Sequence, residues 1–187
     1  MTLVPDASRK DGQLPEARVH GLLEDDRWTS ALLSGLPLRL HYRLELWRDR
    51  ASWFDAAVRS IDWDVVVRRE PLLDQYSVTT VLLGRTRLQR YPDLTALGNA
   101  LGVAYRIAVR ATDKGEYYYV ATLSVSTLSD SDLDEMDRVM RGEAGAATDD
   151  NGNLGDAVGR SARRMLLRVA GLPIMRVDGR SETFDVR

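Results

Sequence analysis

Apolar and polar residues alternate along several segments of the chain. The clearest run spans residues 38–46, where every second side chain is apolar: Leu38, Leu40, Tyr42, Leu44 and Leu46. A period of two is typical of a strand with one buried and one solvated face, because successive side chains point to opposite sides of a sheet. The run therefore predicts a strand of an antiparallel sheet.

A second alternating segment covers residues 54–67, and its apolar phase changes on the way. The apolar residues up to Val58 share one phase, and those from Ile61 to Val67 share the other. One residue must be absorbed between Val58 and Ile61 if both halves are to face the same side. We therefore predict a β-bulge or a sharp bend there.

Further short strands are indicated at residues 19–23, 76–83, 86–91, 174–177 and 183–186. Residues 103–109 and 117–125 also alternate, and the turn-forming sequence Asp113-Lys114-Gly115 lies between them. We predict that these two segments pair as a hairpin.

Four segments carry helix signals. One begins at Asp25 or Asp26 and ends at Gly35, and one follows Asp93 and extends to Leu101. The other two cover residues 129–141 and 154–170. The sequence thus predicts an α+β fold: mainly an antiparallel β-meander or sandwich with three to four helices, two of them near the C-terminus.

A single domain is expected for 187 residues of ordinary globular composition, with 44% apolar and 29% charged residues. We predict a flexible tail at residues 1–17, one α+β domain at residues 18–187, and a mobile loop at about residues 142–153, where the sequence is rich in Gly, Asp and Asn.

Composition excludes several kinds of site. The chain has no cysteine, so disulfides, thiolate zinc sites, iron–sulfur clusters and cysteine nucleophiles are ruled out. A net charge of -2 argues against general nucleic-acid binding. No apolar run is long enough for a membrane-spanning helix, and the polar amino terminus does not resemble a signal peptide. We expect a soluble, non-exported chain, for which peripheral membrane contact stays open.

Few residues are candidates for catalysis. His41 and the pair Asp62/Asp64 lie on the polar phases of their strands, and we interpret all three as solvated side chains. The acidic segments at residues 130–141 and 149–160 have the first spacings of a calcium-binding loop. They lack its glycine and its final glutamate, so we predict no metal and no cofactor.

A contact surface is the remaining candidate site. Trp47 and Tyr118 are large aromatics on the polar phases of their strands, where a partner could contact them. The helix at residues 154–170 has an arginine face, which is either its solvated side or a contact with an anionic partner or lipid headgroup. Its members are Arg160, Arg163, Arg164 and Arg168.

The segment LLSGLPLRLHYRLELWRDRASWFD resembles the start of the bacterial domain of unknown function 4390. The residues that carry the resemblance are Leu33, Gly35, Pro37, Leu38, Leu46, Trp53 and Asp55. A strand at Tyr76–Thr79, a helix near Leu94–Leu101 and a hairpin then follow in a similar order, so the resemblance covers about residues 18–128. The family has no assigned activity, and its members often begin with an apolar export segment, which implies an envelope location.

Three functional hypotheses follow. The first is a non-catalytic binding module of the bacterial envelope that engages a protein partner or an apolar ligand. The second is an enzyme whose site is assembled from scattered polar residues, among them His41, Asp62 and Asp64. The third is a cytosolic regulatory domain.

Overall fold

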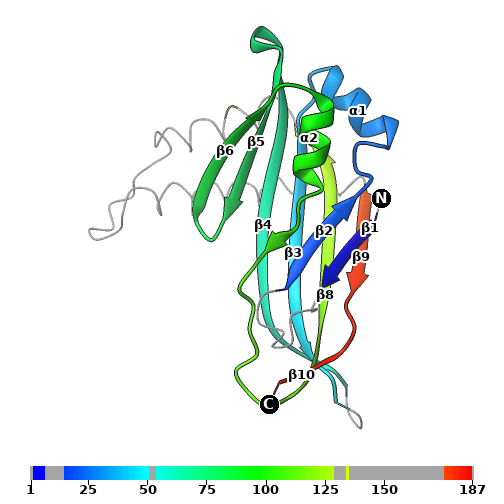
Figure 1. The fold of residues 1–187 in the computed structure, drawn as a ribbon, viewed down its shortest axis with the longest axis vertical. Helices are drawn as coiled ribbons and strands as arrows, with labels where there is room; N and C mark the ends of the chain where they lie inside the picture. The colour runs from blue at the N-terminus through cyan, green and yellow to red at the C-terminus, as the bar shows by residue number, and fades with distance from the viewer. Residues whose placement is uncertain (1, 7–14, 51–53, 129–133, 135–174, 187) are drawn as a thin grey trace, which may run out of the picture.

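The computed structural model describes residues 2–6, 15–50, 54–128, 134 and 175–186. These residues form a long, twisted antiparallel sheet, with a small sheet and two helices in front of one face (Figure 1). The front face of the large sheet, which the small sheet and the helices cover, is called the inner face below, and the opposite face is the outer face.

The large sheet has seven strands. Across the sheet they are β10 (Phe184–Val186), β8 (Gly115–Thr127), β3 (Leu38–Arg48), β4 (Ala56–Glu70), β5 (Gln75–Leu82) and β6 (Arg85–Tyr91), with β9 (Met175–Arg180) on the same side of β8 as β10. A 3-10 turn, η1 (Pro71–Leu73), connects β4 to β5.

Strands β9 and β10 share one edge of β8. Ser181 lies between them and keeps the hydrogen bonding continuous: its N–H donates to the Tyr119 carbonyl at 2.9 Å, and its hydroxyl accepts from the Tyr119 N–H at 2.9 Å. The strands β9 and β10 are thereby joined to one edge of β8.

The small sheet has three strands, β1 (Thr2–Asp6), β2 (Glu16–His20) and β7 (Tyr105–Arg106), with β2 in the middle. Figure 1 shows β2 running in front of β3 and β8. Ala17 and Val19 of β2 join the buried core cluster, so this strand closes the core over the inner face.

The two helices begin and end at the predicted signals. In α1 (Asp26–Leu33) the Asp25 side chain accepts from the N–H of Arg27, and Gly35 follows the helix with a φ of +86°. In α2 (Leu94–Leu101) the Asp93 side chain accepts from the N–H of Ala96 at 2.7 Å. Capping oxygens satisfy N–H groups that have no partner inside the helix, which explains both start points.

The core forms where the predicted leucine face meets the helices and β2. Leu38, Leu40, Tyr42, Leu44 and Leu46 are all buried, as are Trp28 and Leu32 of α1 and Leu97 and Leu101 of α2. The alternation in residues 38–46 therefore predicted the inner face of β3 correctly.

The predicted bulge is confirmed. The register between β3 and β4 pairs Leu46 with Arg59 and Trp47 with Ala57, so Val58 is the extra residue. It allows Ile61–Val67 to lie opposite the leucines of β3, as the change of phase required.

The predicted hairpin of residues 103–109 with residues 117–125 was wrong. In that segment only Tyr105 and Arg106 form a strand, and they pair with β2, whereas β8 pairs with β3. Ile107 and Val109 are buried without ladder pairing: the N–H of Ile107 donates to the carbonyl of Pro15, and the carbonyl of Val109 accepts from the hydroxyl of Tyr119.

The predicted fold class also needs correction. The sheet is mainly antiparallel, and β3 to β6 pair in sequence order as a meander, whereas β8 joins the other side of β3. The described residues contain two α-helices, not three to four. Beyond Leu128, the described residues form the strands β9 and β10, which extend the sheet beside β8. The two helices predicted near the C-terminus, like the loop at 142–153, lie outside the described residues apart from Asp134. Their prediction depended on capping signals, charge order and, for residues 154–170, an apolar stripe. These are local signals, whereas most of the stability of a helix in a protein comes from tertiary packing. The flexibility of residues 1–17 and the single domain at 18–187 stay predictions.

Candidate functional site

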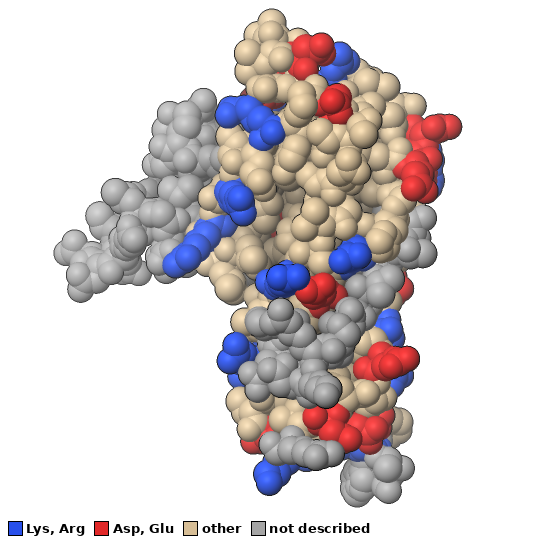
Figure 2. Space-filling model, viewed as in Figure 1, with Lys and Arg blue, Asp and Glu red and all other residues tan. Residues whose placement is uncertain are grey.

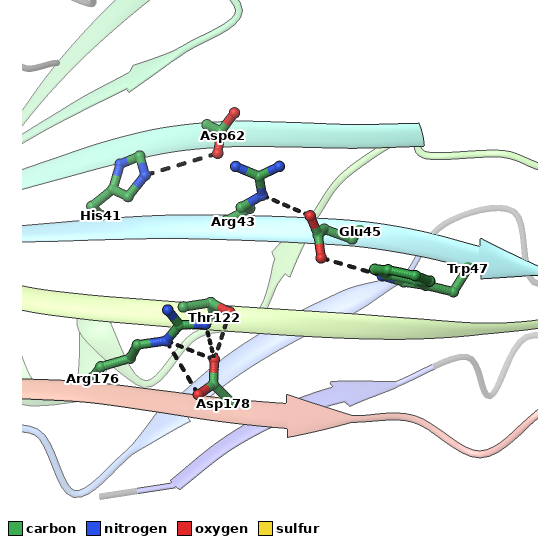
Figure 3. Close-up of polar contacts among 8 residues, drawn as sticks. All are labelled: His41, Arg43, Glu45, Trp47, Asp62, Thr122, Arg176 and Asp178. Atoms are coloured by element: carbon green, nitrogen blue, oxygen red, sulfur yellow. Dashed lines mark hydrogen bonds and ion pairs between the residues drawn. The ribbon is translucent and has the colours of Figure 1, made fainter. Parts of the chain in front are cut away.

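A network of charged side chains occupies the outer face of the sheet. His41 of β3 lies between two carboxylates of β4. Its Nδ1 is 3.0 Å from Oδ1 of Asp64. Its Nε2 is 3.8 Å from Oδ1 of Asp62 (Figure 3). The register places Asp64 directly opposite His41 and Asp62 two residues further along the same face. The structure thus brings together the three residues of the enzyme hypothesis.

Arg39 completes this network. Its Nε donates to the same Asp64 oxygen at 2.8 Å, and both side chains are buried. The interpretation of Asp64 as a solvated side chain was therefore wrong. The neighbouring Val66 and Val81 are also buried on this outer face, so the middle of the sheet is withdrawn from solvent on both sides.

The chemistry open to this network is limited. Both ring nitrogens of His41 face a carboxylate, and none of the three predicted residues lines the groove described below. Within the described ranges, no group of three or more His, Asp or Glu side chains is arranged to hold a metal ion. A general base has to reach a substrate proton. The arrangement is better explained as charge pairing that links β3 to β4.

The two aromatics of the predicted contact surface lie together at the far end of β3 and β8. Trp47 is half-buried, donates from Nε1 to Glu45 at 3.2 Å (Figure 3), and stacks on Tyr118 with ring centroids 6.5 Å apart. Tyr118 is only 5% exposed, because Arg180 covers its ring and its hydroxyl donates to Asp55 at 2.7 Å. Of the pair, Trp47 therefore has the greater surface for a partner.

The contact role of these aromatics stays a prediction. The four arginines assigned to the same surface lie outside the described residues: Arg160, Arg163, Arg164 and Arg168.

A second polar cluster on the outer face attaches β9 to β8. Asp178 accepts from the Thr122 hydroxyl at 2.6 Å and from Arg176 at 3.0 Å (Figure 3). These hydrogen bonds, that of Thr122 first, hold the pKa of Asp178 below its usual value. The cluster stabilises a strand pair and has no feature of a reactive site.

A wide groove lies on the inner side, between the β5–β6 hairpin and α2. This groove has a volume of about 1310 Å³. It exists because β5 and β6 extend beyond the core, so that most of β6 is exposed. Its apolar lining includes Val78, Leu82, Leu83, Ala100, Leu101 and Val103.

Three arginines line the groove and no acidic residue does: Arg85, Arg87 and Arg106. Arg106 forms an ion pair with Glu16 at 2.6 Å. Arg85 and Arg87 are exposed, and they form no ion pair or hydrogen bond with the described part of the chain. Figure 2 shows Lys and Arg side chains spaced along β6 at the side of this face. The groove is therefore apolar inside and positively charged along β6.

An aromatic cluster supports one wall of the groove. Tyr105 lines it, and its ring lies 5.3 Å from that of Tyr42 and 5.5 Å from that of Trp63. Burial raises the pKa of Tyr105, and the net value is about 12 even though a hydrogen bond with Thr80 acts in the opposite direction. The raised pKa reflects how far the phenol is withdrawn from water in this wall of the groove.

The groove was not predicted from the local sequence pattern. Its signal was present in the RTRLQRY sequence of β6, a short strand with three arginines, no acidic residue and weak apolar alternation. A strand of this kind is too polar to be covered on both faces and belongs at an edge. Local sequence does not predict that α2 lies beside β6, because that is a tertiary contact.

Among the described helices, neither is long and apolar enough to cross a membrane. No curated protein and no solved structure matches the chain at a significant level. One family model does match, over residues 8–131, and its description is domain of unknown function (DUF4390). The match covers most of the chain and confirms the predicted resemblance: the protein belongs to the DUF4390 family.

Proposed function

We propose that the protein is a non-catalytic binding module and that its binding site is the groove between the β5–β6 hairpin and α2. The observation that carries the proposal is the lining, which combines exposed apolar side chains with two arginines, Arg85 and Arg87, that have no partner among the described residues. Leu83 is 69% exposed and Val103 is 64% exposed, and both lie in the same concavity. Exposed apolar residues gathered in one concave site are typical of ligand or protein contacts.

The positive charge of the groove favours a ligand that carries an anionic group. Arg85 and Arg87 lie on the inward side of β6 and have no acidic neighbour in the groove. A ligand with an apolar body and an anionic group would remove the apolar surface from water and pair with these guanidinium groups. The volume exceeds the roughly 300–1,000 Å³ of ordinary small-molecule pockets, which favours an elongated ligand or a segment of a protein.

An envelope location is part of the proposal. It is supported by the family, whose members often begin with an apolar export segment. Fractionation of cells that express the full-length native gene with an epitope tag tests it, because recovery of the protein in the cytosolic fraction alone would contradict an envelope role.

Binding in the groove is tested with 1-anilinonaphthalene-8-sulfonate, a probe with an apolar ring system and one sulfonate. We expect saturable fluorescence enhancement for the folded protein and at least about tenfold weaker binding for Val103→Asp, which places a charge on the apolar lining. Leu72→Asp is the matched control, because Leu72 is fully exposed in the β4–β5 connection and outside the groove. Equal binding by the two variants would contradict the proposal. Cooperative unfolding of both variants must be verified, since this dye also binds partly folded proteins.

A further inference from the structure

Strand β6 is an open edge of the sheet. Within the described residues it pairs with β5 on one side and with no strand on the other. Its seven residues include no proline, glycine or acidic side chain. Edge strands with unpaired main-chain groups are templates for another strand unless something blocks them. Among the features of β6 itself, its arginines are what discourages pairing.

The outward main-chain groups of β6 can be assigned from the turn. Leu82 pairs with Arg85, which leaves Leu83 and Gly84 as a two-residue hairpin loop. The residues that flank such a loop bond to each other, and hydrogen-bonded positions then alternate along an antiparallel pair. The groups that face away from β5 therefore belong to Thr86, Leu88 and Arg90.

Charge disfavours a second copy of this chain as the partner strand. Pairing of β6 with another β6 would bring the arginines of both copies together, and like charges across a strand pair are destabilising. A strand with acidic side chains has the opposite effect, because its inward positions would lie beside Arg85 and Arg87.

The turn contributes an independent observation. Leu83 has a φ of +50° and Gly84 a φ of +76°. Two-residue hairpin loops strongly favour Asn, Asp or Gly at such positions, because a leucine there is strained. This leucine is both strained and 69% exposed, and it lies at the end of the groove next to Arg85. An apolar contact with a partner would account for both features.

From these observations we propose that β6 binds an extended acidic peptide segment of a partner protein. The segment adds as a strand at the edge of β6, with carboxylates at alternate positions beside Arg85 and Arg87 and an apolar side chain against Leu83 and Val103. This inference rests on the proposed binding role of the groove and specifies its ligand. Main-chain pairing provides the strand geometry, and the arginines select the charge of the partner.

The test uses fluorescently labelled synthetic peptides and the full chain, with binding followed by anisotropy. The probe is a strand-forming peptide with glutamates at the inward positions beside Arg85 and Arg87 and a leucine at the inward position next to Leu83, compared with the same peptide in which lysine replaces each glutamate. We expect the acidic peptide alone to bind, with an affinity that falls as salt concentration rises. The double variant Arg85→Glu/Arg87→Glu should raise the Kd at least about tenfold. Arg59→Glu/Arg110→Glu is the matched control, because both residues are exposed and neither lines the groove.

Backbone methylation separates strand addition from simple charge attraction. N-methyl groups on one alternate set of peptide nitrogens should abolish pairing with β6, and those on the other set should be tolerated, since only one set of N–H groups faces the protein. Equal binding by the two methylated peptides would overturn strand addition.

Leu83→Asn separates binding from folding. Asparagine suits the positive φ at this position, so the variant should unfold at an equal or higher denaturant concentration while its Kd for the acidic peptide rises several-fold. An unchanged Kd for the acidic peptide would show that Leu83 does not contact it. Loss of peptide binding with intact, Val103-dependent dye binding would overturn this inference alone. Absence of both would overturn the proposed function as well.

Discussion

Arg39 and Asp64 form an ion pair that is buried on the outer face of the sheet, with Arg39 Nε 2.8 Å from Asp64 Oδ1. The two side chains are 5% and 4% exposed. Removing one member of such a pair leaves an uncompensated buried charge, whereas replacing both with apolar residues is often tolerated.

We therefore expect Asp64→Leu to lower the free energy of unfolding by about 3–5 kcal/mol, and Arg39→Met/Asp64→Leu to recover most of that loss. Urea unfolding followed by tryptophan fluorescence measures both. A double variant as unstable as the single one would show that Arg39 has a stabilising role apart from Asp64, for example through its other contacts.

Tyr42 and Trp63 stack in the core with ring centroids 4.8 Å apart and an interplanar angle of 2°. The Tyr42 hydroxyl and the Trp63 Nε1 are buried, and neither has a hydrogen-bond partner in the described part of the chain. Tyr42→Phe removes an unsatisfied hydroxyl and keeps the stacked ring, so it should leave the free energy of unfolding unchanged or raise it by up to about 1 kcal/mol.

Tyr119→Phe is the matched comparison, because the Tyr119 hydroxyl donates to the Val109 carbonyl at 2.8 Å. Its loss should cost about 1–2 kcal/mol in the same unfolding experiment. A destabilised Tyr42→Phe protein would indicate that a water molecule satisfies the Tyr42 hydroxyl in solution.

Gly35 terminates α1 with a φ of +86°, and a Cβ added there would meet nothing within 4 Å. The N–H groups of Gly35 and Leu36 return to the carbonyls of Leu32 and Ala31, as at a helix C-terminus with a left-handed residue. Gly35→Ala should therefore destabilise the protein by about 1 kcal/mol through backbone strain alone, and Gly35→Asn by less. Thermal unfolding of the two variants tests this order, and equal effects would imply that steric contact matters more than φ.

Local pattern predicted the parts of this fold that local physics determines. Gly35 and the capping aspartates Asp25 and Asp93 marked the helix ends, because orphan backbone groups need those partners. The phase change before Ile61 marked the bulge at Val58, because a strand cannot change the face it buries without an extra residue.

Other parts depend on partners that are distant in the sequence. Ile107 and Val109 have the alternation of a strand, but they are buried beside Pro15 and Tyr119 and not in a ladder. The polar phase of β4 predicted a solvated Asp64, and the structure buries it with Arg39. The groove arises because the β5–β6 hairpin extends past α2, which is a tertiary relationship that no local pattern encodes.

The attachment of β9 to β8 should depend on pH through Asp178. Hydrogen bonds from Thr122 and Arg176 hold the pKa of this carboxyl below its ordinary value of 3.8. A lowered pKa in the folded state means that the unfolded chain binds the proton more tightly, so the stabilisation is fully present above about pH 4 to 5 and is lost as the pH falls through the folded-state pKa. The strand should therefore loosen in acid before the centre of the sheet does.

Amide hydrogen exchange, corrected for intrinsic rates, measures this effect. Protection of residues 175–180 should fall between pH 5 and pH 3 (roughly the interval around a carboxyl pKa) more than protection of β4 does. Thr122→Val removes the strongest donor to Asp178. It should weaken β9 protection at pH 5 and reduce its acid dependence, because the carboxyl pKa then moves back toward that of the unfolded chain. An acid dependence identical in the wild type and in Thr122→Val would mean that a group other than Asp178 controls the loosening of β9.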